Sequence, residues 1–160
     1  MRRADRAITD FKEIRAIVER AKVLHLGLNG GERPYIVPLH YGVVWEGEKP
    51  VFYVHGAKEG RKLALIRRDG RVFVEIDTAG ELVSGGETPC RYGAVFESVM
   101  CDAEAEILPA GEEKRRALQI LMKTQTGRDF TITPEMADGA TGKARSYLTA
   151  DDRQRKEAAK

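Results

Sequence analysis

The segment Val51–Gly70 places one histidine and several basic residues around the start of a predicted helix. Its first residues, VFYVH, are apolar or β-branched like a strand and end on His55. A turn rich in Lys and Gly follows, and a helical pattern comes after it. The first backbone N–H groups of a helix have no partner within it and attract anions. Because Lys58, Arg61 and Lys62 would add full positive charges, this pattern indicates a phosphate site, and hence a nucleotide-like ligand.

Each of these residues also has a purely structural interpretation. Charged residues at a helix start usually only solvate it, and a histidine at a strand end can be an ordinary surface residue. We assign Arg61 to the solvent side of the helix and Lys58 and Lys62 to the anion. His25 alternates with two leucines in a predicted strand, and we interpret it as structural.

Other motifs for catalysis or cofactor binding are missing or incomplete. No G-x-G-x-x-G follows a predicted strand, which argues against a dinucleotide site. No G-x-S-x-G motif of a serine nucleophile occurs. The segment GATGKA lacks both the spacing of a P-loop and the Ser or Thr after its Lys. The three histidines have no carboxylate at metal-ligand spacing, so we expect no metal site.

Length, charge and cysteine content bound the class of protein. The chain has 160 residues and a net charge of +2, which gives no indication of nucleic-acid binding. It contains neither a long apolar run typical of a membrane span nor a secretory signal. Cys90 and Cys101 lack C-x-x-C spacing and predict buried free thiols in a reducing cytoplasm. We expect one domain over residues 1–149, a solvated or disordered tail over 150–160, and a cytoplasmic location.

The periodicity of apolar residues predicts a mainly β fold with peripheral helices. Tight turns join most of the strands, which favours a small β-barrel over a doubly wound sheet. A barrel of this size is filled by its own side chains, so a ligand would bind outside it and a second subunit could complete the site. Apolar residues on both faces of 35–44 and 93–108 fit a dimer interface. Strands are expected at 23–28, 34–45, 51–55, 71–77 and 93–108, helices at 10–22, 60–70 and 111–126, and a loop at 78–90.

Four segments, taken in order, resemble one known family. They are PYIVPLHYGVV, FYVHGAKEGRKLALIRRDGRVFVEID, YGAVFESVMCDAEAEIL and EEKRRALQILM. Together they are similar to the pyridoxamine 5′-phosphate oxidase-related split-barrel flavoproteins, and most similar to the nitroimidazole-resistance (NimA-type) branch. The resemblance runs from about Asp10 to Met136. It implies an FMN-binding split β-barrel and a homodimer with two symmetric clefts at the subunit interface.

The resemblance also implies which residues form the FMN site. The VPLH strand would line one side of the flavin and its ribityl chain, and HGA would approach the isoalloxazine edge. Two lysines of AKEGRK would meet the phosphate, and the SV pair would come from the partner subunit. His55 would also take part in catalysis. The implied cofactor-binding residues are Val37, Pro38, Leu39, His40, His55, Gly56, Ala57, Lys58, Lys62, Ser98 and Val99.

The chain departs from its relatives after the last predicted helix. Relatives have a further strand just before a TGK element, whereas here only a few residues separate Met136 from Thr141-Gly142-Lys143. The segment DFTIT, residues 129–133, is the candidate substitute for this strand. We therefore expect a barrel that closes differently, or an open edge that a dimer covers.

Two classes of function follow from the resemblance. The first is an FMN-dependent oxidoreductase that reduces a small electron-poor, nitroaromatic-like molecule. The alternative is a non-catalytic module that binds a flavin, haem or F420. A small-barrel nucleic-acid binder is disfavoured because the net charge is close to zero.

Overall fold

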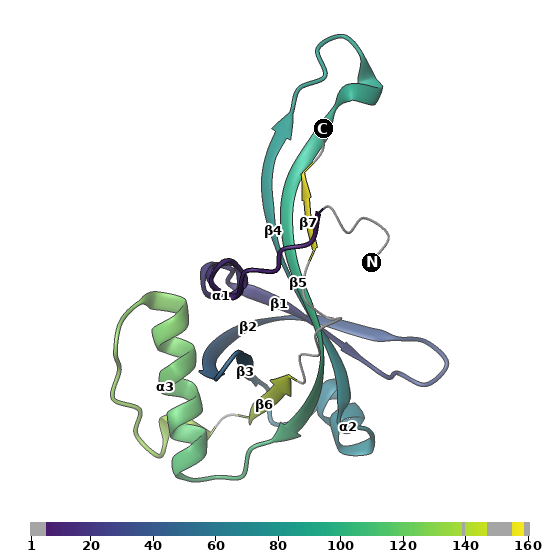
Figure 1. Ribbon diagram of the computed structural model, residues 1–160. Helices are drawn as coiled ribbons and strands as arrows, with labels where there is room; N and C mark the ends of the chain where they lie inside the picture. Colours follow the sequence, from purple (N-terminus) through teal and green to yellow (C-terminus); the bar gives the residue numbers. More distant parts are fainter. Residues whose placement is uncertain (1–5, 139, 147–154, 159–160) are drawn as a thin grey trace.

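The protein is a small β-barrel with helices around it, seen in a computed structural model that describes residues 6–138, 140–146 and 155–158 (Figure 1). Hydrogen-bonded neighbours follow the order β4-β1-β2-β3-β6-β5, and pairing between β4 and β5 closes the ring. A last strand, β7, pairs with β5 outside this ring. The strands are β1 (Val23–Leu28), β2 (Tyr35–Glu46), β3 (Lys49–Gly56), β4 (Arg71–Val83), β5 (Gly93–Ile107), β6 (Ala140–Ser146) and β7 (Arg155–Ala158).

Three α-helices lie outside the barrel, as the sequence predicted. They are α1 (Phe11–Arg20), α2 (Arg61–Arg68) and α3 (Glu112–Thr126). Asp10 caps α1, because its side-chain oxygen accepts a hydrogen bond of 2.9 Å from the backbone N–H of Lys12. None of the helices within the described residues is both long and apolar enough to span a membrane.

The core fills the inside of the barrel. Buried residues alternate along β1 and the first half of β4, as expected for strands with one buried face. Residues 50–54 of β3 are all buried, because α3 covers the outer face of this strand. Among the most buried are Leu24, Phe52, Ile76 and Cys101. Both cysteines are free thiols, but only Cys101 is buried; Cys90 is exposed, contrary to the prediction, because it lies in a short surface turn before β5.

Strand β2 bends where its pairing partner changes. Residues 35–40 pair with β1, and residues 41–46 pair with β3. Pro38 lies in the first half, where β2 has no described partner on its other side, so the missing N–H leaves no gap in a two-sided ladder. Gly42 lies at the bend, and a Cβ there would meet the backbone N of Leu121 at 2.4 Å. This lack of a side chain lets α3 pack directly on β2.

Strands β4 and β5 extend beyond the barrel as a long two-stranded arm (Figure 1). β4 continues to Val83, so the first part of the predicted loop at 78–90 is strand. The pairing shifts register between Ala79 and Leu82. Residues 79–83 show no alternation of apolar and polar types because they are exposed on both faces of the arm.

The C-terminal region closes the barrel in a way the sequence did not predict. The DFTIT segment, residues 129–133, forms no strand. Instead β6, which contains the TGK residues, inserts between β3 and β5, and Gly142 is aligned with both Val54 and Ile107. Within the predicted tail, β7 pairs with residues 95–98 of β5, which differs from a solvated helix or disordered chain. Both strands are short and contain few apolar residues. The sequence therefore gives no local signal for them, and their hydrogen bonds to distant strands define them.

Candidate functional site

The end of β3 and the start of α2 form the centre of the candidate site. His55 is exposed near the end of β3, and Gly56 is the last residue of that strand. Gly60 caps α2 with φ 131°, a conformation that favours glycine, and no side chain caps this helix end. The first turn of α2 carries no acidic residue. The nearest carboxylate along the chain is Glu59, which lies just before the cap and outside the helix.

Lys62 extends back from α2 over the end of β3. A Cβ on Gly56 would lie 2.5 Å from Lys62 Nζ, so the missing side chain makes room for the ammonium group. Burial lowers the pKa of Lys62 from its usual range. Within the described part of the chain, no hydrogen bond or ion pair engages this ammonium. A partly desolvated cation in this position is suited to pair with an anion.

His55 lies in a positive electrostatic environment. Its partial burial is the main cause that lowers its pKa, and the charges of Lys62 and Lys114 lower it further. The imidazole is therefore neutral at neutral pH and has one nitrogen able to accept a proton or a metal bond. Three basic side chains from β3, α2 and α3 thus act on the same region.

The VPLH residues of β2 do not share one face. Val37 and Leu39 are half-buried and pack against the core, whereas Pro38 and His40 are exposed on the other face. Because side chains alternate along a strand, all four cannot line one wall of a ligand with their side chains. His40 Nδ1 lies 3.0 Å from the carbonyl oxygen of Lys22 on the neighbouring chain segment.

His40 and His55 lie just beyond the last pair of the β2–β3 ladder, which is Tyr41 with Val54. There the two strands have different partners, because His40 is aligned with Val23 of β1 and His55 with Thr141 of β6. Both histidines are exposed.

Ser98 and Val99 lie far from His55 within one chain. The His55 end of the barrel meets β5 near Ile107, and Ser98 is nine residues earlier on that strand, roughly 30 Å for extended chain. Val99 belongs to the core with 2% exposure. Ser98 is also buried and is aligned with Asp77 of β4. A site containing both ends would need the partner subunit that the resemblance implies.

The turn between β3 and α2 holds the remaining predicted residues. Ala57 and Lys58 are both exposed there, next to the cap of α2. Arg61 is directed elsewhere, because its guanidinium carbon lies 4.8 Å from the ring centroid of Tyr35. This contact agrees with the assignment of Arg61 outside the anion site.

Lys114 is the residue that the sequence analysis missed. It is only 9% exposed although it lies in the first turn of α3. Its spacing carried a signal, because Lys114 lies three, four and seven residues before Ala117, Leu118 and Leu121 and so shares the buried face of α3 with them. Its proximity to His55 comes from packing of α3 beside β3 and β6.

A separate cluster on the outer face of β1 and β4 joins His25, Glu75 and Asp77. His25 Nδ1 lies 2.9 Å from Glu75 Oε2 and 3.7 Å from Asp77 Oδ1. Their candidate ligand atoms all lie within 4.8 Å of one another, so one cation could contact all three. The sequence analysis expected no metal site, because His25 lies about 50 residues from the two carboxylates and meets them only through the pairing of β1 with β4. The side chains are partly exposed, and they also satisfy each other as ion pairs.

Comparison with known proteins identifies similar chains. A family profile described as Pyridoxamine 5′-phosphate oxidase matches residues 10–152. Among proteins with curated descriptions, none matches the chain significantly.

Several solved structures have the same fold, and the names of some of them mention a cofactor. A candidate 5-nitroimidazole antibiotic resistance protein from Bacteroides thetaiotaomicron shares 28% identity at a TM-score of 0.68, covering 88% of this chain and 87% of that one. An FAD and haem binding protein from Mycobacterium smegmatis shares 15% identity at a TM-score of 0.73, covering 96% and 74%. The flavocytochrome Anf3 from Azotobacter vinelandii shares 15% identity at a TM-score of 0.68, covering 100% and 83%.

Proposed function

The chain belongs to the pyridoxamine 5′-phosphate oxidase family, and from that premise we propose that it binds FMN and acts as an oxidoreductase on a small electron-poor molecule. The observation that carries the proposal is the region around His55, Lys62 and the start of α2. It combines a helix whose first turn carries no acidic residue and a half-buried ammonium with no described partner. These groups fit a phosphate, since charge-assisted hydrogen bonds are about twice as strong as neutral ones.

In this proposal each residue has a defined task. Lys62 and the N–H groups at the start of α2 hold the phosphate, and Lys58 in the preceding turn supports them. His55, which is neutral and exposed, orients the ring edge and exchanges a proton with the second molecule. When bound, FMN would supply the electron transfer to an electron-poor, nitroaromatic-like acceptor. FMN is preferred to FAD because one terminal phosphate matches one cationic site.

A homodimer is part of the same proposal. An apolar row crosses the outer face of three strands, because Gly27 of β1 is aligned with both Ile36 of β2 and Phe73 of β4. Ile36 is 64% exposed and Phe73 is 42% exposed. A second copy placed on this face would cover them. The resemblance implies that Ser98 and Val99 reach the site from the partner, but within one chain both residues are buried.

A non-catalytic binding module is the second candidate. Two of the similar folds are described as haem-containing or flavocytochrome proteins. A neutral histidine such as His55 has the protonation state that ligates haem iron. In this alternative the same surface would hold a flavin or haem without turnover.

The test begins with the visible spectrum of the full-length protein as purified. We expect a flavin spectrum and release of FMN, rather than FAD, on denaturation. A colourless protein that gains no absorbance with FMN or haem would refute both candidates. A Soret band without flavin would favour the haem module.

Turnover separates the enzyme from the module. The flavin would be reduced anaerobically, and a nitroimidazole would then be added while flavin absorbance is followed. Rapid reoxidation that slows in His55→Gln, with FMN still bound, would support the enzyme. Tight FMN binding without reoxidation by any nitroaromatic acceptor would favour the module.

A further inference from the structure

Lys114 is buried, and it has no hydrogen-bond or ion-pair partner among the described residues. Lysine is almost never fully buried unless its charge is paired, because transfer of an ammonium group from water is costly. The Lys114 side chain is nevertheless only 9% exposed. Among the residues that the structure describes, no hydrogen bond or ion pair reaches it. Such a group calls for an anionic partner that is not part of the described chain.

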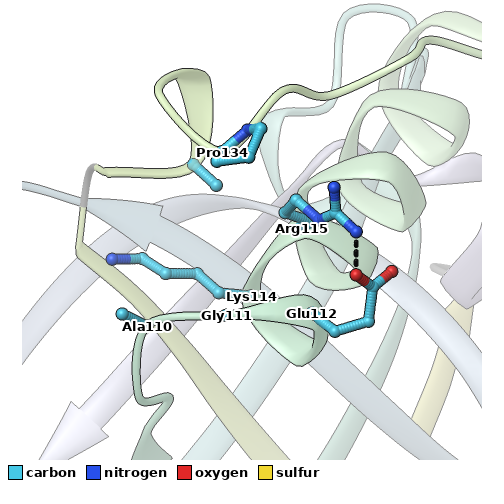
Figure 2. Close-up of a pocket in the computed structure, with 7 residues that line it drawn as sticks. Ala110, Gly111, Glu112, Lys114, Arg115 and Pro134 are labelled. Atoms are coloured by element: carbon cyan, nitrogen blue, oxygen red, sulfur yellow. Dashed lines mark hydrogen bonds and ion pairs between the residues drawn. The ribbon is translucent and has the colours of Figure 1, made fainter.

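Lys114 lines a pocket of about 430 Å³ at the N-terminal end of α3 (Figure 2). Figure 2 shows its side chain extending along one side of the pocket, away from Arg115. Arg115 pairs with Glu112, so the opposite charges of these two lining residues offset each other. Ala110, Pro134 and Ala137 supply apolar walls. Of the charged residues that line the pocket, Lys114 is therefore the one with no described residue of opposite charge beside it.

The helix end adds a second source of positive potential. α3 has 15 residues, and Gly111 caps it without any side-chain hydrogen bond. The N–H groups of its first turn lack partners inside the helix and carry the positive end of the dipole. One carboxylate, Glu112, lies in this turn and lines the pocket, but it is held by Arg115.

We propose that this pocket binds the carboxylate of a small organic acid, with Lys114 as its pairing cation and the apolar walls around its body. One ammonium and one helix end balance a single negative charge better than the double charge of a phosphate. The volume lies within the range of about 300–1,000 Å³ typical of small-molecule sites and exceeds what an inorganic anion needs. The residues that line this pocket differ from Lys58 and Lys62, which are proposed to hold the FMN phosphate, although the charge of Lys114 also reaches His55.

Benzoate is the probe, and neutral benzamide of similar shape is its control. Isothermal titration of the full-length protein should give at least tenfold tighter binding of benzoate than of benzamide. Inorganic phosphate should bind more weakly than benzoate. Equal binding of the acid and the amide, stronger binding of phosphate, or no binding of benzoate would each overturn the proposal.

Variants on α3 test the role of Lys114. Lys114→Met keeps the length of the side chain but removes the charge, and it should weaken benzoate binding about 10- to 100-fold, the effect of one charge-assisted hydrogen bond. Lys123→Met is the matched control, since Lys123 is exposed on the same helix and pairs with Asp129. Wild-type affinity in Lys114→Met would refute the assignment.

A structural defect would show as a lower melting temperature. Because the variant replaces an unpaired buried charge with an apolar group, it should melt at the same or a higher temperature than the wild type. Should it fail to fold, NMR of the wild-type protein decides. The backbone amide signals of residues 112–115 must move with benzoate and stay fixed with benzamide; unmoved signals with benzoate would overturn the proposal.

Discussion

Replacing Lys62 with methionine should weaken FMN binding while leaving riboflavin binding unchanged. Lys62 Nζ lies over Gly56 beside His55 and has no partner among the described residues. Riboflavin differs from FMN by lacking the phosphate. The loss should therefore appear only with the ligand that carries the charge that Lys62 is proposed to hold.

The size of the loss follows from the exposure of Lys62. A hydrogen bond to a charged group contributes about 1.5–3 kcal/mol when well shielded. Lys62 is only half-buried, so solvent screening favours the lower part of this range. We expect a loss of about 1.4–2 kcal/mol, or about 10- to 30-fold in Kd.

Calorimetric titration of FMN and riboflavin into both proteins measures this effect. Arg67→Met is the matched control, because it removes one positive charge from the exposed side near the other end of α2. Its FMN affinity should stay within about twofold of the wild type, as expected for a screened surface charge. Melting curves of the two variants check that neither has lost its fold.

Two results would refute the reasoning. Unchanged FMN affinity in Lys62→Met would show that the phosphate is held elsewhere. An equal loss for riboflavin and FMN would show that Lys62 supports the ring or the fold rather than the phosphate.

Three further outcomes are expected. Gly42→Ala should destabilise the protein by about 1–3 kcal/mol in chemical denaturation, because the new Cβ would collide with the backbone of Leu121 and displace α3; an unchanged midpoint would contradict this packing. Tyr41→Phe should cost about 1–3 kcal/mol, since the buried hydroxyl donates to the carbonyl of Val18 and ties α1 to β2. The pKa of His55 is lowered in the free protein, and a bound phosphate would raise it, so binding takes up a proton. The FMN affinity of the wild type relative to His55→Gln should thus rise as the pH falls from about 8 to 6 around the usual histidine pKa, and a flat ratio would exclude this linkage.

Local patterns in the sequence predicted most of the barrel and the centre of the candidate site. The β3 strand, its turn and α2 are contiguous, so one short segment contains His55, Gly60 and Lys62. The alternation of β1 and the helical spacing of α1 likewise depend on near neighbours. These features could be predicted because each is decided within about a dozen residues.

Strand geometry corrected the set of residues expected from β2. Four consecutive residues of VPLH appeared as one wall in the sequence, but the strand alternation divides them between two faces. Pro38 and His40 are exposed on the outer face, while Val37 and Leu39 pack against the core. The alternation along this half of β2, which pairs with β1, makes this distinction.

The sequence by itself determined the barrel strands with strong periodicity, the three helices and the cationic turn after His55. Tertiary structure decided the closure by β6, the length of the β4–β5 arm and the burial of Lys114. β6 and the arm have little apolar periodicity that a sequence could reveal. Their strands are defined by hydrogen bonds to partners distant in the chain. Helical spacing places Lys114 on the face of Ala117 and Leu118, but only the packing of α3 on the barrel removes it from water and brings its charge near His55.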